Sequence, residues 1–189
     1  MHINFLKKYY FISKFDPDHI INLDKNISII YRNYSIKYDE KLILKIKEFC
    51  KKNGRKFYIS NDLKLALKLN LEGVYLPSFN NSLKINLYLK KKNFLIIGSA
   101  HNIKEIKIKE NQNVKEIFLS PLFKIKNGTY LGLNRFKILS NFTKINKIAL
   151  GGINKNNINK LSNIHISGFA GIKYFDDLKK RPLKIGAFK

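Results

Sequence analysis

Several short apolar runs in this sequence end in glycines, which could expose backbone N–H groups to an anion. One run, Ile148–Gly152, ends in two adjacent glycines, and a second run, Gly168–Ile172, carries glycines as well. Glycine has no Cβ, so the backbone N–H groups beside it can approach a phosphate closely. A tight turn between a strand and a helix is the alternative explanation of the adjacent pair. The predicted phosphate-binding residues are Gly151, Gly152, Gly171 and Ile172.

Polar side chains follow the other apolar runs. Arginine and lysine can hold anionic groups, a carboxylate can bind a cation, and an imidazole with an ordinary pKa of about 6.5 can move protons near neutral pH. Each residue could instead serve the structure: Asp62 could cap a helix, Arg32 could form an ion pair and His101 could be a surface residue. The candidates for catalysis or substrate binding are Arg32, Asn61, Asp62, Ser99, His101, Lys124 and Lys126.

The strands that must position these residues are predicted from the apolar runs. The runs are continuous rather than alternating, which is typical of strands covered on both faces in a parallel sheet. Residues such as Ile29, Val74 and Phe118 are therefore expected inside the sheet or under its helices. Strands are predicted at Tyr9–Ser13, Ile27–Arg32, Lys56–Ser60, Gly73–Leu76, Phe94–Ala100, Glu116–Pro121, Lys147–Gly152 and Gly168–Ile172.

Amphipathic segments between these runs predict helices. The clearest is Asp39–Lys52, whose apolar residues fall on one stripe. Further helices are expected at Asp16–Leu23, Asp62–Leu69, Ser82–Lys91, Asn102–Glu110, Asn134–Asn141 and Lys155–Leu161.

This alternation predicts the fold class. Eight evenly spaced strands joined by mostly helical crossovers indicate an α/β protein, a single (β/α)8 TIM barrel that occupies residues 1–189 as one domain. An open doubly wound sheet is the alternative. In such a barrel the active site lies at the C-terminal ends of the strands, and the loops after strands seven and eight frequently hold a phosphate. The glycine-bearing runs occupy those two places, and the other candidates would surround the same mouth.

The composition bears on partners and location. The chain has 37 Lys and Arg against 13 Asp and Glu, a formal net charge of +24, yet only four basic residues are Arg. Lys, Asn and Ile have A/T-rich codons, so a biased genome explains the charge better than nucleic-acid binding, for which Arg is the better contact residue. A single cysteine, Cys50, excludes an internal disulfide and a thiolate metal cluster. No apolar span of about 20 residues occurs, so we expect a soluble, cytoplasmic protein with no membrane partner.

An ordered set of segments resembles a known family over about residues 9–175. The segments YISNDLKLALKLNLEGVYLPS, IIGSAHN, EIFLSPLF, LGLNRFKIL, IALGGINKNNI and GFAGI are similar to those of the thiamine phosphate synthase and TenI family. The resemblance implies a (β/α)8 barrel that handles a thiazole phosphate. The synthases of the family join it to a pyrimidine diphosphate with the help of magnesium, whereas the TenI-type members isomerise a carboxythiazole phosphate.

Two substrate-binding motifs of the synthases are incomplete here. The pyrimidine-site motif Gln-x-Arg-x-Lys corresponds to Ile30–Tyr34, which keeps only Arg32. The Pro-Thr-x-Thr-Lys loop corresponds to Lys124–Gly128, where Lys124 or Lys126 would have to replace the aligned lysine. A reaction that expels diphosphate needs concentrated positive charge, so these losses count against a synthase.

The magnesium site that the resemblance implies is also incomplete. Asn61 and Asp62 match the Asn-Asp pair whose Asp helps to hold the metal, but the second metal-binding Asp falls at Asn80. One carboxylate in place of two predicts weak magnesium binding at Asp62.

Other positions resemble the TenI-type branch. Leu76-Pro77-Ser78 is similar to the Leu-Pro-Ser found there, and His101 matches the histidine assigned as the acid/base. The resemblance therefore predicts first a TenI-like proton transfer on a thiazole phosphate, with His101 and Asp62 as catalytic residues and no cofactor. A diverged thiamine phosphate synthase is the alternative, and only that reaction calls for magnesium.

A non-catalytic barrel with a basic, nucleic-acid-binding surface is the second alternative. For both enzymatic functions, the proton transfer and the synthase reaction, the expected partner is a small phosphorylated thiazole. The oligomeric state stays open, with a homo-oligomer as one outcome.

Overall fold

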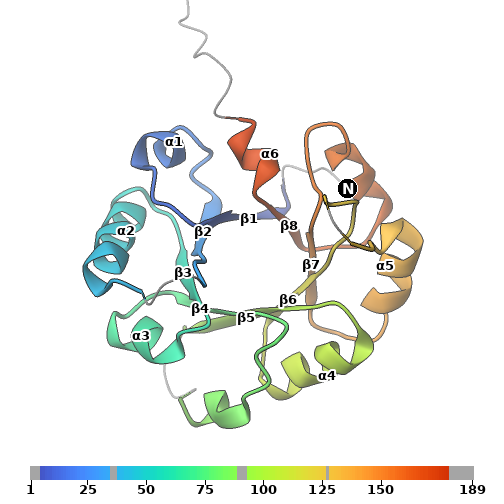
Figure 1. The fold of residues 1–189 in the computed structure, drawn as a ribbon, viewed down its shortest axis with the longest axis horizontal. Coiled ribbons are helices and arrows are strands. Elements are labelled where there is room, and N and C mark those ends of the chain that lie inside the picture. The colour runs from blue at the N-terminus through green and yellow to red at the C-terminus, as the bar shows by residue number, and fades with distance from the viewer. Residues whose placement is uncertain (1–4, 35–37, 89–92, 127, 179–189) are drawn as a thin grey trace, which may run out of the picture.

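Eight parallel strands form a closed barrel in the order β1-β2-β3-β4-β5-β6-β7-β8 (Figure 1). The computed structural model describes residues 5–34, 38–88, 93–126 and 128–178. Strand β1 pairs with β8, with Lys7 opposite Gly168 and Tyr10 opposite Gly171, so the sheet has no open edge. The predicted barrel is confirmed, and the doubly wound sheet is excluded. The strands are β1 Lys7–Ile12, β2 Ile27–Tyr31, β3 Phe57–Ser60, β4 Gly73–Leu76, β5 Leu95–Ala100, β6 Glu116–Leu119, β7 Asn146–Leu150 and β8 Gly168–Gly171.

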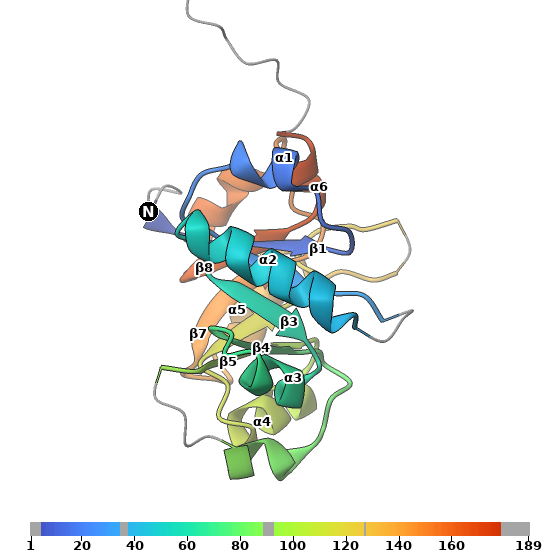
Figure 2. The same ribbon diagram turned by 90° about the vertical axis from the view of Figure 1, so that its left-hand side faces the viewer.

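Helices surround the strands on the outside of the barrel (Figure 1), and α2 lies across the face seen in Figure 2. Four of them begin at a side-chain cap, because Asp16, Asp39, Asp62 and Asn102 accept a hydrogen bond from a backbone N–H in the first turn. The α-helices are α1 Pro17–Ile21, α2 Glu40–Lys52, α3 Leu63–Lys68, α4 Ile103–Asn111, α5 Gly132–Ser140 and α6 Lys173–Asp176, and the 3-10 helices are η2 Leu83–Tyr88 and η3 Ile158–Asn163.

Two of the predicted helices, over 82–91 and 155–161, are the 3-10 helices η2 and η3 instead, and residues 89–91 lie outside the described part of the chain. Side-chain amides compete with helical hydrogen bonds before η3. The Asn157 Oδ1 accepts from the Asn154 backbone N–H at 2.9 Å, and the Asn154 Oδ1 accepts from the Asn156 N–H at 2.9 Å. These bonds hold the segment in turns, so a regular α-helix does not start where the sequence predicted it.

Side chains fill the barrel interior. Phe11, Tyr75 and Phe118 pack edge to face there, with ring centroids between 5.0 and 6.0 Å apart. At the N-terminal end of the barrel, the buried Glu116 carboxylate accepts hydrogen bonds from Tyr9 and Lys7. Ile29, Val74 and the other strand residues expected to be buried are all buried. The mouth at the C-terminal ends of the strands therefore has an aromatic floor.

Candidate functional site

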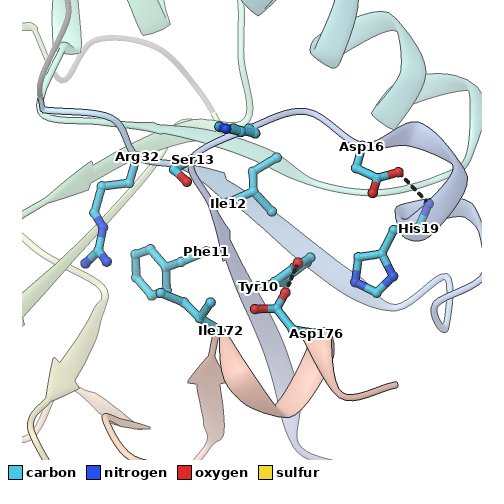
Figure 3. A pocket seen from close by; sticks show the side chains of 10 residues that line it. Tyr10, Phe11, Ile12, Ser13, Asp16, His19, Arg32, Ile172 and Asp176 are labelled. Atoms are coloured by element: carbon cyan, nitrogen blue, oxygen red, sulfur yellow. Dashed lines mark hydrogen bonds between the residues drawn. The ribbon is translucent and has the colours of Figure 1, made fainter. Parts of the chain in front are cut away.

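The end of β2 places a cation over this floor. The Arg32 guanidinium carbon lies 4.9 Å from the ring centroid of Phe11 and 5.9 Å from that of Tyr34. Figure 3 shows the Phe11 ring between Arg32 and Ile172, the residue that precedes α6. Arg32, Phe11 and Ile172 line one pocket of about 380 Å³, and Tyr34 lies outside its lining. The barrel thus brings together two predicted residues, Arg32 and Ile172, that are far apart in the sequence.

An aromatic pair stands beside Arg32 on the rim of the mouth. The Tyr34 and Phe79 rings are 5.5 Å apart and nearly perpendicular, and both side chains are more than half exposed, at 52% and 61%. The Tyr34 hydroxyl lies 3.0 Å from the Ser60 hydroxyl, at the end of β3. Sequence reasoning missed this pair. The sequence pattern that could have predicted the pair is an aromatic residue directly beside a polar residue, once after β2 and once after β4.

The ends of β3 and β4 bring Asn61, Asp62 and Asn80 together, as the family pattern predicts. The Asn80 Nδ2 donates to the Asn61 Oδ1 at 2.7 Å. The Asp62 Oδ1 accepts from the Leu65 backbone N–H at 2.9 Å, so this carboxylate caps α3. The helix-capping role that was the alternative for Asp62 is therefore present.

These residues do not fit a protein-held magnesium ion. Magnesium demands near-octahedral oxygen ligands, usually one or two carboxylates with waters or substrate phosphates. One Asp62 oxygen is engaged in the cap, and the Asn80 Oδ1 already accepts from the Ser82 backbone N–H and the Gln112 Nε2, at 3.0 and 3.1 Å. Within the described ranges, no three His, Cys, Asp or Glu side chains gather into a metal-binding group.

Ser99 and His101 are two positions apart but face different surroundings. Ser99 is buried in β5, where its hydroxyl hydrogen-bonds the Tyr75 phenol. Burial raises the pKa of Tyr75, which stays protonated. His101 follows the strand, is about half exposed, and its Nδ1 lies 3.0 Å from the Glu105 Oε2 of α4. Sequence reasoning missed Glu105 as the partner of this imidazole.

The His101 ring lines a pocket of about 630 Å³ between α4 and α5, with Ile103 and Arg135 among its other walls. The pocket that holds Arg32 is lined by different residues, mainly from β1 and the segment after it, with others from α1 and α6. The structure therefore does not bring His101 to the Arg32 pocket, although both follow strand ends.

The adjacent glycines after β7 are required by the neighbouring loop. Gly151 and Gly152 have φ of 94° and 70°, and a Cβ on Gly152 would lie 2.5 Å from the Phe123 carbonyl oxygen and 2.7 Å from that of Lys124. Such contacts leave no room for a side chain, so the glycines allow the loops after β6 and β7 to pack together. Packing against this loop therefore accounts for the pair without a ligand. The phosphate site remains a prediction.

Gly171 is different, because no close contact requires a glycine there. A Cβ at this position would meet only the Tyr174 Cβ, at an ordinary 3.5 Å. Lys124 and Lys126 lie on the exposed loop between β6 and α5, and the Lys124 backbone is next to Gly152. The predicted phosphate-binding residues and Lys124 thus belong to neighbouring loops.

Together these features define the class of protein: a (β/α)8 barrel with cationic, amide and aromatic side chains at the carboxyl ends of its strands. Within this class, the chain belongs to the family described as thiamine monophosphate synthase, whose model matches residues 25–175. The thiamine-phosphate synthase of Fusobacterium nucleatum is 30% identical over 162 residues, which cover 82% of this chain and 79% of the relative. A synthase of Prochlorococcus marinus is 29% identical over 140 residues, which cover 71% of this chain and 40% of the longer relative.

Solved structures agree on the fold. The thiamine phosphate pyrophosphorylase of Pyrococcus furiosus has a TM-score of 0.73 at 18% identity, with 94% of this chain and 95% of that chain covered. That of Bacteroides thetaiotaomicron has a TM-score of 0.59 at 17% identity, with 97% and 89% covered. The sequence relatives are named synthases, which favours the synthase alternative over the TenI-type reaction predicted first and does not decide between them. In the described residues, no helix combines the length and apolar character needed to cross a membrane.

Proposed function

We propose that this chain is an enzyme that couples a pyrimidine diphosphate to a thiazole phosphate at the barrel mouth. The position of Arg32 is the observation that carries the proposal: its guanidinium lies over the Phe11 ring and shares a pocket with Ile172. The names of the sequence relatives support the same reaction.

The residues at the mouth supply positive charge and N–H donors. Expulsion of diphosphate places negative charge on its oxygens, and a preorganised cation stabilises that charge. Arg32 provides such a cation. The backbone around Gly171 and Ile172 and the nearby Lys124 would hold the phosphate of the thiazole, while Ser60 and Asn61 at the end of β3 would bind polar groups of the pyrimidine.

Turnover of the two substrates tests this proposal. Arg32→Ala should lower kcat/KM for product formation by about a hundredfold or more, because it removes the cation. Arg32→Lys keeps the charge but loses the planar group that stacks on the rings, so it should restore only part of the activity. Lys137→Ala, an exposed charge on α5, is the control. Equal turnover in Arg32→Ala and wild type would contradict the proposal.

Proton transfer on a thiazole phosphate is the second candidate, and the pairing of His101 with Glu105 favours it. A carboxylate on Nδ1 fixes the tautomer of the imidazole and leaves Nε2 as the nitrogen that exchanges a proton. If this reaction takes place, His101→Gln should lower the isomerisation rate by about a hundredfold or more. An unchanged rate would assign the proton transfer to another group.

A further inference from the structure

A buried lysine lies behind the loop that follows β4, and the proposed reaction does not use it. The side chain of Lys109, in α4, is 0% exposed. Its ammonium donates to the backbone carbonyl of Asn80 at 2.7 Å and to the Gln112 Oε1 at 3.0 Å. A Cβ on Gly98 of β5 would lie 3.1 Å from the Lys109 Cδ, so this glycine makes room for the lysine. A buried charge is costly, and its hydrogen bonds must offset that cost.

The bonds around Lys109 fix the orientation of the Asn80 amide. The Ser82 backbone N–H can only donate, and it lies 3.0 Å from the Asn80 Oδ1. The Gln112 Nε2 lies within 2.9–3.1 Å of three oxygens, the Asn80 carbonyl, the Asn80 Oδ1 and the Ser82 carbonyl. The Asn80 side-chain oxygen thus receives two donors. Its NH₂ group is turned toward Asn61, whose Oδ1 it meets at 2.7 Å.

The hydrogen bonds run in one donor-to-acceptor direction from Lys109 to Asn61 at the rim of the mouth. Because the Asn61 oxygen accepts from Asn80, the NH₂ group of Asn61 is the part of that amide that can bind a ligand. Hydrogen bonds in series polarise one another, so the buried ammonium strengthens the donors that follow it. A divalent cation at this position would face the N–H donors of the Asn61 amide, whereas it needs oxygen ligands.

We propose that Lys109 and Gln112 are positioning residues that orient Asn80 and, through it, Asn61, so that the corner between β3 and β4 binds a hydrogen-bond acceptor of the ligand in place of a divalent cation. The acceptor is of the kind that a ring nitrogen or a phosphate oxygen offers. The inference rests on the proposed function only for the nature of this ligand. Its tests use metal binding and side-chain resonances, so they can fail independently of turnover.

Manganese relaxation in the full, ¹⁵N-labelled chain tests the exclusion of a cation. With MnCl₂ as the probe, the wild type should show no selective broadening of the amides of Asn61, Asp62 and Ser82. Asn80→Asp restores a carboxylate at the corner, and the same amides should broaden at about tenfold lower Mn²⁺. Selective broadening of the wild type at the Mn²⁺ concentrations that affect Asn80→Asp would overturn the proposal.

Side-chain amide resonances test the role of Lys109. Lys109→Met should shift the NH₂ resonances of Asn80 and Asn61, whereas Lys107→Met, the same change at an exposed position of α4, should leave them in place. Unchanged Asn61 and Asn80 resonances in Lys109→Met would overturn the proposal.

A pH titration of the wild type gives a measurement that needs no variant to fold. Burial lowers the pKa of Lys109 to about 8, although the charge of Glu105 opposes the shift. The ammonium contacts the Asn80 carbonyl and the Gln112 Oε1, and the charge that acts on it is that of Glu105. From β5, Gly98 lies beside the Cδ of the lysine. The Asn61 NH₂ resonance should therefore titrate with a midpoint near 8, which a purely structural lysine would not cause. A flat profile at Asn61 across this pH range would overturn the proposal.

Discussion

At the scale of single residues, the partners of the mouth side chains decide what these can bind. The Arg32 guanidinium carbon lies 4.9 Å from the Phe11 ring centroid and 5.9 Å from that of Tyr34, and we expect these contacts to restrict its long side chain before an anion arrives. Ordering a side chain on binding costs about 0.5–1.5 kcal/mol, and a preordered cation avoids much of that cost. The glycines of the mouth also differ in their neighbours. Gly152 packs against the loop after β6, whereas no close contact requires a glycine at Gly171.

Gly171→Ala tests the phosphate site without disturbing the fold. The added methyl group makes only an ordinary 3.5 Å contact with Tyr174, so the melting temperature should stay close to that of the wild type. The methyl group would occupy the space through which a phosphate approaches the backbone, so the affinity for a thiazole phosphate should fall by about tenfold or more, equivalent to ~1.4 kcal/mol. Calorimetry measures this affinity.

Gly152→Ala is the contrasting variant. Its Cβ would lie 2.5 Å from the Phe123 carbonyl oxygen at a φ of 70°, so we expect a loss of about 1–3 kcal/mol in the free energy of unfolding. An unchanged affinity in Gly171→Ala would remove Gly171 from the phosphate site.

At the scale of elements, helices that begin directly after strands use the polar residues of the mouth as caps. Asp62 caps α3 immediately after β3, and Asn102 caps α4 immediately after His101. Glu105, in the first turn of α4, accepts a hydrogen bond from the His101 backbone N–H and lies beside the ring Nδ1, while Asn102 accepts from the Glu105 backbone N–H. The same short connection thus serves helix formation and the placement of a candidate catalytic residue.

Two substitutions of Asp62 separate capping from chemistry. Asn caps a helix as well as Asp does, whereas Ala does not, so Asp62→Ala should lose about 1 kcal/mol of stability and Asp62→Asn almost none. Because the Asp62 Oδ1 is engaged by the Leu65 N–H, we expect Asp62→Asn to keep most of its turnover. Denaturant unfolding and steady-state kinetics measure the two effects. A large loss of turnover in a stable Asp62→Asn protein would instead assign Asp62 the catalytic role that the family resemblance implies.

At the scale of the whole molecule, ionisable groups inside the barrel and its outer layer make stability depend on pH. Burial raises the pKa of Tyr9 and Tyr58, and the carboxylate of Glu116 adds to both shifts. These phenols stay protonated in the folded barrel. Lys109 is shifted in the opposite direction, toward its neutral form.

The contribution of Lys109 to the free energy of unfolding has a defined sign. Its folded pKa of about 8 lies below the ordinary 10.5, so the unfolded chain binds more protons between these two values, and this group makes stability rise with pH across that window. The cost of burying the charge is fully present below pH 8. The stability of Lys109→Met relative to wild type should therefore be highest below that pH, and it should fall by up to about 3 kcal/mol as the pH rises, at ~1.4 kcal/mol per pKa unit.

Urea unfolding of Lys109→Met and wild type across this pH range measures the difference in their free energies of unfolding. The titration of the tyrosines cancels in this difference, because both proteins contain the same tyrosines. Lys107→Met is the control, because its side chain is exposed on the same helix. A stability difference between Lys109→Met and wild type that does not vary with pH would contradict the shifted pKa.

The sequence by itself determined the barrel and the residues at its mouth. Burial on both faces of a parallel strand requires a continuous apolar run, and eight such runs in alternation with amphipathic segments leave few other folds. The positions of Arg32, Asn61 and the glycines at strand ends follow from the same pattern, because the carboxyl ends of all strands meet at one end of the barrel.

Only the tertiary structure decided which way these side chains face and which atoms are already engaged. His101 is paired with Glu105 beside α5, Asp62 is engaged by α3, and the orientation of Asn80 is set by Lys109 and Gln112 about 30 positions further along the chain. A strand-end pattern fixes where a backbone lies, to within a residue or two. The direction of a polar side chain depends on donors and acceptors contributed by other elements, and these become neighbours only when the barrel closes.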